Sequence, residues 1–440
     1  MSDTTHPLHC DQCEQTFRGQ ACAINSKPGV CGKDADVESL QKILLYGLKG
    51  MAAYAHHARR LGYSDENVSA FIEEALFATM TNVNFDVPTL LELVLECGRK
   101  NLRVMEMLDT GHVERFGQPE PRTVLEGTQA GPGILITGHD LLDLHDLLRQ
   151  CEGTDVKVYT HGEMLPAHMY PKLAQHPNLA GHFGDAWQKQ KDDFKAFPGP
   201  VLATTNCVLI PREEYANRLY TTRATAVPGA TRITDEDFSA VIAHAQTLPE
   251  CTGNVVKEST VGFHRSVILD KAGDIVDAVK LGQISHFFLI GGCDGSEPGR
   301  NYYSDYAQNA PEDSFILTLG CGKFRIRDYD YGTHLGLPRL LDMGQCNDAY
   351  GAIQVASALA EAFECGVNDL PLTIVLSWFE QKAVAVLLTL LALDVKNITV
   401  GPNPPAFVTP NVFKVLQDKW GLKVMGQDGK ADVQAVFATA

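Results

Sequence analysis

Short apolar runs alternate with helix-length stretches through most of the chain after residue 125, and this alternation constrains the fold more than any other feature. It is typical of βαβ units, which build parallel sheets covered by helices. We expect strands at 133–137, 155–159, 200–203, 286–290, 315–319, 339–342, 372–376 and 398–400. A polar stretch punctuated by Pro249, Gly253 and Gly262 interrupts the pattern. The sequence therefore predicts two Rossmann-like α/β domains with mainly parallel sheets, at 126–255 and 256–440.

The first 125 residues follow a different pattern. Residues 1–33 are rich in Cys and Gly and predict a compact loop. From 37 to 61 apolar residues recur at helical spacing, and Gly62 marks a stop. Two further helical segments begin after Asp65 and Asp86, a residue type that favours helix starts. The region 1–125 should thus form a loop followed by a three-helix bundle, which makes the chain a multidomain α and α/β protein.

Composition limits the expected partners. Lys plus Arg number 37 against 54 Asp plus Glu, which gives a net charge of −17. An acidic field repels phosphate backbones and anionic lipid, so we expect no nucleic acid and no membrane as partner. The longest apolar stretch, 383–393, is far shorter than the roughly 20 residues of a membrane-spanning helix. The N-terminus shows no basic segment followed by an apolar one, and we expect a cytoplasmic protein.

Four of the twelve cysteines lie in the N-terminal loop, at Cys10, Cys13, Cys22 and Cys31. Four thiolates in such a loop can hold zinc or an iron–sulfur cluster. Zinc sites commonly repeat the C-x2-C pair, whereas here only the first two cysteines are so close. Unligated thiols in a polar loop would be reactive. We therefore favour an iron–sulfur cluster over zinc and over free thiols.

A second set of candidate ligands follows the predicted strands, with one candidate after nearly every strand. The set is His139, Glu163, Cys207, Cys293, Cys321, Cys346 and Glu380. The carboxyl ends of parallel strands meet at one edge of a sheet, so these side chains can converge. Thiolates suit sulfide-bridged iron, whereas imidazole and carboxylate suit oxygen-bridged iron, and the mixture favours a cluster with both bridges over zinc. Taken singly, each candidate has a simpler explanation, as a buried core thiol or as a charge near a helix start.

Several neighbouring residues have less defined roles. His161, His168 and His145 lie beside the candidates in sequence, where proton transfer and plain packing are both open. Cysteines outside the two sets are expected to be structural; they are Cys97, Cys151, Cys251 and Cys365. No GxGxxG fingerprint follows a strand and opens a helix, so any nicotinamide or flavin step is expected to belong to a partner protein.

A set of motifs, in order along nearly the whole chain, resembles the hybrid-cluster proteins, also called hydroxylamine reductases and related to the carbon monoxide dehydrogenases. The motifs are CDQCEQT, THGEMLPAH, TTNCV, GGCDG, LGCGKFR, GQCNDAY and SWFEQKAVAVLLTLL. The resemblance implies a 4Fe-4S cluster, or in some members a 2Fe-2S cluster, on the N-terminal cysteines. It also implies a hybrid iron–sulfur–oxygen cluster at the domain interface on the second ligand set, with a persulfide on Cys293. The chain looks like the short form, which lacks a second helical bundle.

The resemblance further implies an oxidoreductase that reduces hydroxylamine to ammonia and water, and nitric oxide to nitrous oxide as a second reaction in nitrosative-stress defence. Electrons would come from an external donor protein through the N-terminal cluster. Glu380, Lys382, His161 or His168 would supply protons. Two alternatives stay open at this point: a non-catalytic redox or nitric oxide sensor that mediates nitrosylation, and a nickel–iron carbon monoxide dehydrogenase. Glu163 and Glu380 disfavour the latter, because carboxylates favour oxygen-bridged iron.

Overall fold

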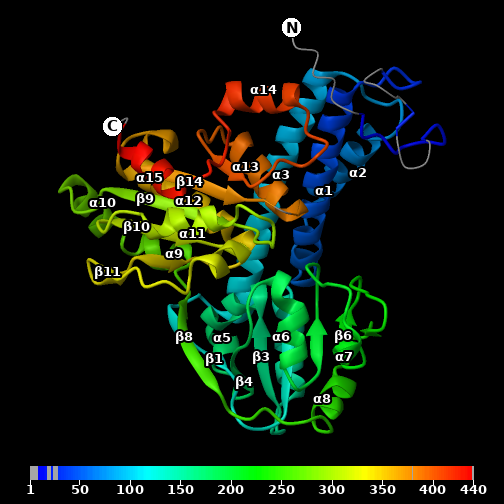
Figure 1. Ribbon diagram of the computed structural model, residues 1–440, viewed down its shortest axis with the longest axis vertical. Coiled ribbons are helices and arrows are strands. Elements are labelled where there is room, and N and C mark those ends of the chain that lie inside the picture. Colours follow the sequence, from blue (N-terminus) through cyan, green and yellow to red (C-terminus); the bar gives the residue numbers. More distant parts are fainter. Residues whose placement is uncertain (1–7, 17–20, 23–27, 379, 439–440) are drawn as a thin grey trace. The chain divides into compact units, whose positions relative to one another are not determined.

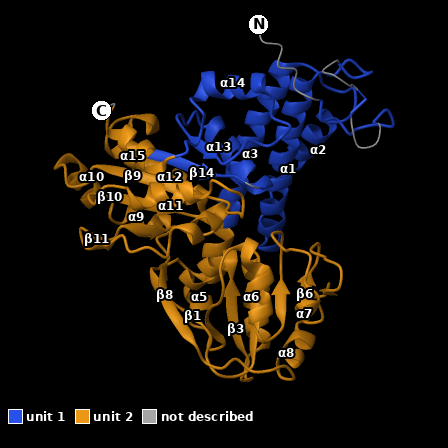
Figure 2. Ribbon diagram, viewed as in Figure 1, with its two compact units in different colours: residues 1–108, 373–427 blue, residues 109–372, 428–440 orange. Residues whose placement is uncertain are grey.

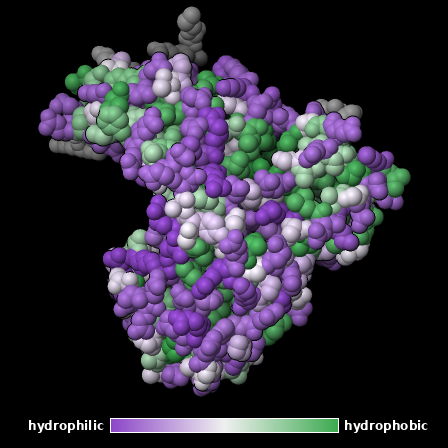
Figure 3. All heavy atoms as spheres, turned by 180° about the vertical axis from the view of Figure 1, so that it is seen from behind, coloured by the Kyte–Doolittle hydropathy of each residue, from purple (hydrophilic) through white to green (hydrophobic). Residues whose placement is uncertain are grey.

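The computed structural model describes residues 8–16, 21–22, 28–378 and 380–438 (Figure 1). The chain divides into two compact units, coloured in Figure 2. Unit 1 comprises residues 1–108 and 373–427, and unit 2 comprises 109–372 and 428–440. Within the described residues, no helix has the length and apolar character needed to cross a membrane. Hydrophilic residues cover much of the face shown in Figure 3.

The three predicted N-terminal helices are confirmed. They are α1 (Ala35–Arg60), α2 (Glu66–Ala78) and α3 (Val87–Phe116). The side chain of Asp34 accepts a bond from the Val37 amide at the start of α1, and Asp65 caps α2 in the same way. Gly62 has a φ of +92°, the left-handed conformation that ends a helix at low cost to glycine.

Unit 1 also contains the C-terminal strands and helices α13 (Gln381–Ala392) and α14 (Pro410–Trp420). Strands β14 (Leu372–Ser377), β15 (Thr399–Gly401) and β16 (Lys423–Val424) run parallel. Helix α13 packs closely on α1 at Gly50 and on α3 at Gly98. A Cβ at either position would collide with the α13 backbone, so the close packing depends on glycine. The first two strands were predicted, whereas β16 is only two residues long and carries no readable pattern.

Unit 2 contains an eight-stranded sheet of order β7-β6-β5-β2-β3-β4-β1-β8. Its strands are β1 (Arg122–Gly127), β2 (Gly133–Thr137), β3 (Lys157–His161), β4 (Leu179–His182), β5 (Val201–Ala203), β6 (Leu219–Thr222), β7 (Thr231–Ile233) and β8 (Val255–Val261). Neighbouring strands are parallel except β8, which pairs antiparallel with β1. Intervening helical segments are α4 (Leu141–Gln150), η1 (Gly162–Met169), α5 (Pro171–Ala174), η2 (Trp187–Lys189), α6 (Gln190–Ala196), α7 (Glu213–Ala216) and α8 (Ser239–Ala245).

A second set of parallel strands in unit 2 has the order β13-β10-β9. These strands are β9 (His286–Gly292), β10 (Ser314–Thr318) and β13 (Leu340–Asp342). The remaining elements are α9 (Arg265–Leu269), α10 (Ala272–Lys280), α11 (Asn301–Gln308), η3 (Gly320–Arg325), β11 (Thr333–His334), β12 (Leu337–Pro338), η4 (Cys346–Asp348), α12 (Ala349–Ala362), η5 (Val367–Asp369) and α15 (Gly429–Ala438). All eight predicted strands are therefore present, and the expected multidomain α and α/β fold with mainly parallel sheets is confirmed.

Close packing of α3 on α13 makes Gly98 sensitive to substitution. We expect Gly98→Ala to lower the free energy of unfolding by about 1–3 kcal/mol, because the new methyl would overlap the Leu388 backbone. Denaturant unfolding would measure the change. Gly273→Ala is the matched control in α10, because a Cβ there meets nothing within 4 Å. Equal losses of unfolding free energy in both variants would contradict the close packing of α3 on α13 at Gly98.

Candidate metal-cluster site

Each predicted ligand of the second set lies just after the carboxyl end of a strand. His139 follows β2, Glu163 follows β3, Cys207 follows β5, Cys293 follows β9, Cys321 follows β10, Cys346 follows β13 and Glu380 follows β14. Six of the seven belong to unit 2, and Glu380 belongs to unit 1. Parallel pairing thus places the six candidates of unit 2 at strand ends, as the alternating pattern predicted.

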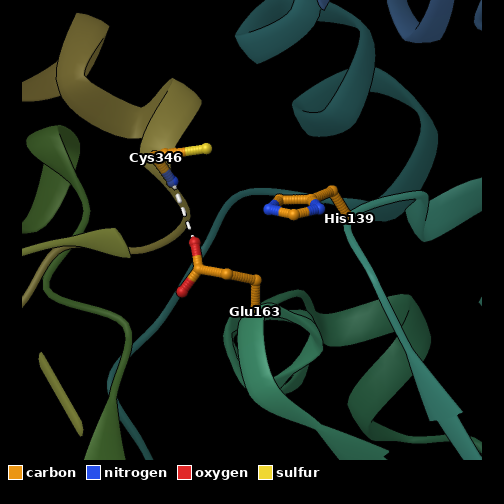
Figure 4. Close-up of side chains that lie close together, drawn as sticks. All are labelled: His139, Glu163 and Cys346. Atoms are coloured by element: carbon orange, nitrogen blue, oxygen red, sulfur yellow. Dashed lines mark hydrogen bonds between the residues drawn. The ribbon is translucent and has the colours of Figure 1, made fainter. Parts of the chain in front are cut away.

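Three of these side chains form the closest group, shown in Figure 4. Possible ligand atoms of His139, Glu163 and Cys346 all lie within 4.8 Å of one another. His139 and Glu163 are buried, and Cys346 is half-buried. The Cys346 amide donates a 3.1 Å hydrogen bond to Glu163 Oε2. An imidazole, a carboxylate and a thiol can thus face the same metal.

Thr205 holds the His139 ring in place. The Thr205 hydroxyl lies 2.8 Å from His139 Nδ1 and also accepts a 3.0 Å bond from the His139 amide. Gly138 has a φ of +114°, and a Cβ there would collide with the side chains of Thr204 and Thr205. Because Thr205 engages Nδ1, Nε2 is the ring nitrogen suited to a metal.

Gln345 connects the ligand loops, and sequence reasoning missed it. Its side-chain amide donates to the carbonyl oxygens of His139, at 3.2 Å, and Glu163, at 2.7 Å. The side chain is only 1% exposed. The only signal in the sequence is its position directly before Cys346. The carbonyl groups that a glutamine side chain binds depend on the fold, so its partners could not be predicted.

The buried Cys321 thiol is influenced by the charges of other candidate ligands. Burial raises the pKa of the Cys321 thiol well above its usual value, and the charges of Glu163, Cys207, Cys293 and Cys346 raise it further. Such groups repel one another when ionised in a site that water does not reach. A bound cation removes this repulsion and favours the thiolates. The donor set therefore fits a metal cluster held by several sulfurs.

Cys207 has a strained backbone. Its φ of +67° lies in the left-handed region, which costs a non-glycine residue free energy. The Asn206 side chain donates to Cys207 Sγ at 3.3 Å, and Gln190 donates to the Cys207 carbonyl. Such strain is common where a side chain is fixed for function.

The histidines beside the ligands bond to side chains other than the metal candidates. His161 is fully buried, with Nδ1 3.1 Å from Thr137 Oγ1 and Nε2 3.1 Å from Asp193 Oδ2. His168 Nε2 lies 3.0 Å from Thr160 Oγ1, and burial lowers the pKa of His168 to about 4. His168 is therefore neutral at pH 7 and poorly suited to donate a proton.

His145 and His182 also have side-chain partners outside the candidate ligand set. His145 lies on α4, with Nδ1 3.1 Å from Asp146 Oδ1. His182, which the sequence did not single out, lies with Nδ1 2.9 Å from the same Thr160 hydroxyl that contacts His168. Burial also lowers the pKa of His182 well below its usual value. This buried histidine pair is thus neutral.

The other two predicted catalytic residues lie in unit 1. Glu380 caps α13, where its Oε1 accepts a 3.2 Å bond from the Lys382 amide. Lys382 is 2% exposed, and its Nζ lies 5.9 Å from the centre of the Tyr54 ring. The buried ammonium thus has a cation–π partner on α1.

The N-terminal cysteines form no single-ion site within the described part of the chain, where the one group of three or more close ligands is the His139 group. Thiolates on different irons of a cluster need not lie as close together as the ligands of one ion, so this result does not argue against a cluster. Cys10 and Cys22 are half-buried, whereas Cys13 and Cys31 are exposed. The Val30 amide donates to Cys22 Sγ at 3.3 Å, a bond type common around cluster thiolates.

The cysteines expected to be structural belong neither to the N-terminal set nor to the strand-end set of candidate ligands. Burial raises the pKa of Cys97 and of Cys151 to about 12, and that of Cys251 to about 11. Cys365 is half-buried on the segment after α12. The buried thiols of Cys97, Cys151 and Cys251 are protonated at neutral pH and therefore behave as small apolar side chains.

We expect Cys97 and Cys151 to resist iodoacetamide at pH 8, because a pKa near 12 leaves roughly one thiol in ten thousand ionised. Mass spectrometry of the folded protein would measure the modified fraction. The same thiols should react fully in denaturant, which is the control. Rapid alkylation of either thiol in the folded chain would contradict its assignment.

The chain matches known proteins over most of its length. The family model described as "Prismane/CO dehydrogenase family" matches residues 8–92 and 86–430. The chain is 58% identical over 416 residues to a hydroxylamine reductase of Moorella thermoacetica, covering 94% of this chain and 97% of that protein. It is 51% identical over 420 residues to the hydroxylamine reductase of Burkholderia ambifaria strain MC40-6, covering 95% of this chain but 75% of that protein.

Solved structures share the fold at low sequence identity. A carbon monoxide dehydrogenase from Thermococcus sp. AM4 aligns with a TM-score of 0.79 at 16% identity, covering 99% of this chain and 90% of that one. Carbon monoxide dehydrogenase IV from Carboxydothermus hydrogenoformans aligns with a TM-score of 0.78 at 14% identity, covering 100% and 93%. With the family match over most of its length, the chain belongs to the Prismane/CO dehydrogenase family.

Proposed function

We propose that this chain is an iron–sulfur oxidoreductase that reduces hydroxylamine to ammonia and water. The N–O bond breaks, and each hydroxylamine takes up two electrons and two protons. The observation that carries the proposal is the close group of His139, Glu163 and Cys346, whose possible ligand atoms lie within 4.8 Å of one another. Hydroxylamine reductases 50–58% identical to this chain support the choice of substrate.

The ligand set of the proposed active site is His139, Glu163, Cys207, Cys293, Cys321, Cys346 and Glu380. A hybrid iron–sulfur–oxygen cluster bound there would supply electrons and an open iron for the N–O group, with a persulfide on Cys293. Thr205 fixes the His139 ring, and Gln345 fixes the loops of His139 and Glu163. These contacts set ligand geometry before substrate arrives.

In this proposal Cys10, Cys13, Cys22 and Cys31 would hold a second cluster, of the 4Fe-4S type with 2Fe-2S as the alternative, which would supply the chemistry for accepting electrons. An external donor protein supplies them, since no dinucleotide fingerprint occurs in the sequence. Protons come from Glu380, Lys382 or His161. His168 is the weakest candidate, because burial holds its pKa near 4.

Anaerobic turnover with reduced viologen dye tests the function directly. We expect iron-loaded, nickel-free protein to form one ammonium for each hydroxylamine and each two electrons consumed. Nitric oxide would be compared as a rival substrate in the same assay. Iron-loaded protein that binds nitric oxide but turns over neither compound would overturn the proposal in favour of a sensor.

We expect Thr205→Val to reduce hydroxylamine turnover by about 10–100-fold, because the His139 ring loses the hydroxyl that orients it. Activity per bound iron and total iron per chain would both be measured. Thr225→Val serves as the matched control, since that hydroxyl donates to the Thr204 carbonyl. Full turnover in Thr205→Val would exclude the orienting role.

A further inference from the structure

Lys33 lies in the N-terminal cysteine loop, two residues after Cys31 and just before α1. Its side chain is 1% exposed, although lysine is almost never fully buried without partners. Lys33 Nζ donates to Glu38 Oε2 and to Gln41 Oε1, both at 2.7 Å. Two residues of the first turns of α1 therefore hold the ammonium in one position.

The third contact of this ammonium is a sulfur. Lys33 Nζ donates to Cys10 Sγ at 3.8 Å, within the range of a hydrogen bond to sulfur. Cys10 is one of the four thiols assigned to the N-terminal cluster. The buried cation thus contacts a proposed cluster ligand directly, and all three contacts lie within unit 1.

Stability alone is a weak reason for this arrangement. A buried ion pair costs desolvation that its Coulomb attraction barely repays, and apolar replacements of such pairs are often neutral or stabilising. The Lys33–Glu38 pair is 1% exposed on both sides, so this cost applies in full. The burial of the Lys33–Glu38 pair beside Cys10 therefore indicates a role other than stability.

Both charges act on the Cys10 sulfur. Lys33 Nζ lies 3.8 Å from Cys10 Sγ, and Glu38 Oε2 lies 2.7 Å from the same ammonium. Adding an electron to a cluster adds negative charge, which a nearby cation stabilises and a nearby anion destabilises. Hydrogen bonds to cluster sulfurs shift the reduction potential in the same way as a cation.

We propose that Lys33 raises the reduction potential of the N-terminal cluster through its charge and its hydrogen bond to Cys10, and that Glu38 limits this effect. Gln41 holds the ammonium in place without adding a charge. The inference rests on the proposed function, because it takes a cluster on Cys10, Cys13, Cys22 and Cys31. Lys33 acts through a ligand and is a positioning residue.

Redox titration of the iron-loaded full chain, followed by electron paramagnetic resonance, tests the inference. We expect Lys33→Met to lower the midpoint potential of the N-terminal cluster by at least a tenfold change in its reduction equilibrium, which is 59 mV for one electron. Glu38→Gln should raise the potential. Lys49→Met is the control, since Lys49 is exposed on α1 and solvent screens its charge.

Opposite shifts in Lys33→Met and Glu38→Gln would support the inference, because mere disruption of the loop would not change sign with the charge removed. Shifts no larger than that of Lys49→Met, or shifts in one direction for both variants, would overturn it. If Lys33→Met fails to retain the cluster, Glu38→Gln decides, and an unchanged or lower potential overturns the inference. A wild-type protein without any N-terminal cluster signal would overturn the proposed function and this inference together.

Discussion

Burial of the Cys321 thiol beside other candidate ligands is the constraint that shapes the chemistry of the candidate site. Glu163, Cys207, Cys293 and Cys346 all act on that buried thiol. Ionised together these groups would repel one another, which disfavours their charged forms in the absence of a cation. A cation bound among them would reverse the sign of the interaction and would favour the thiolates.

Neutral groups fix the geometry of these loops without changing the charge balance. The Gln345 amide spans the carbonyls of His139 and Glu163, and the Thr205 hydroxyl orients the His139 ring. The buried Lys323 ammonium adds a charged contact near the same loops. Lys323 Nζ donates to Asp342 Oδ1 at 2.6 Å and to the Gly344 carbonyl at 2.7 Å, which ties the Cys321 loop to the segment that leads to Cys346.

Burial explains only part of which strands could be predicted from the sequence, because β6 is buried at all four residues and its short LYTT sequence was still missed. All five residues of β2 are buried, so that strand reads as an unbroken apolar run. Edge strand β8 alternates exposed and half-buried residues, and its polar sequence at 255–261 was included in a predicted domain boundary at 249–262. Strand β7 is three residues long with two of them exposed. The division into domains at 125 and 255 stays a prediction.

Residue chemistry made the seven candidate ligands easy to select from the sequence, because thiols, an imidazole and carboxylates recur after the strand ends, and their role as ligands stays a prediction. Thr205 and Gln345 were not readable, since a hydroxyl or amide acts through whichever loop the fold brings to it. Lys33 was missed for the opposite reason: a lysine before a helix looks like a surface residue, and only the fold buries it against Glu38 and Cys10. The two cysteine sites therefore differ in kind. At the proposed hydroxylamine site, the neutral hydrogen bonds of Thr205 and Gln345 position the candidate ligands. At the N-terminal loop, the fixed charge of Lys33 contacts Cys10, where the proposed task is to accept and pass on electrons and the reduction potential is the property to be set.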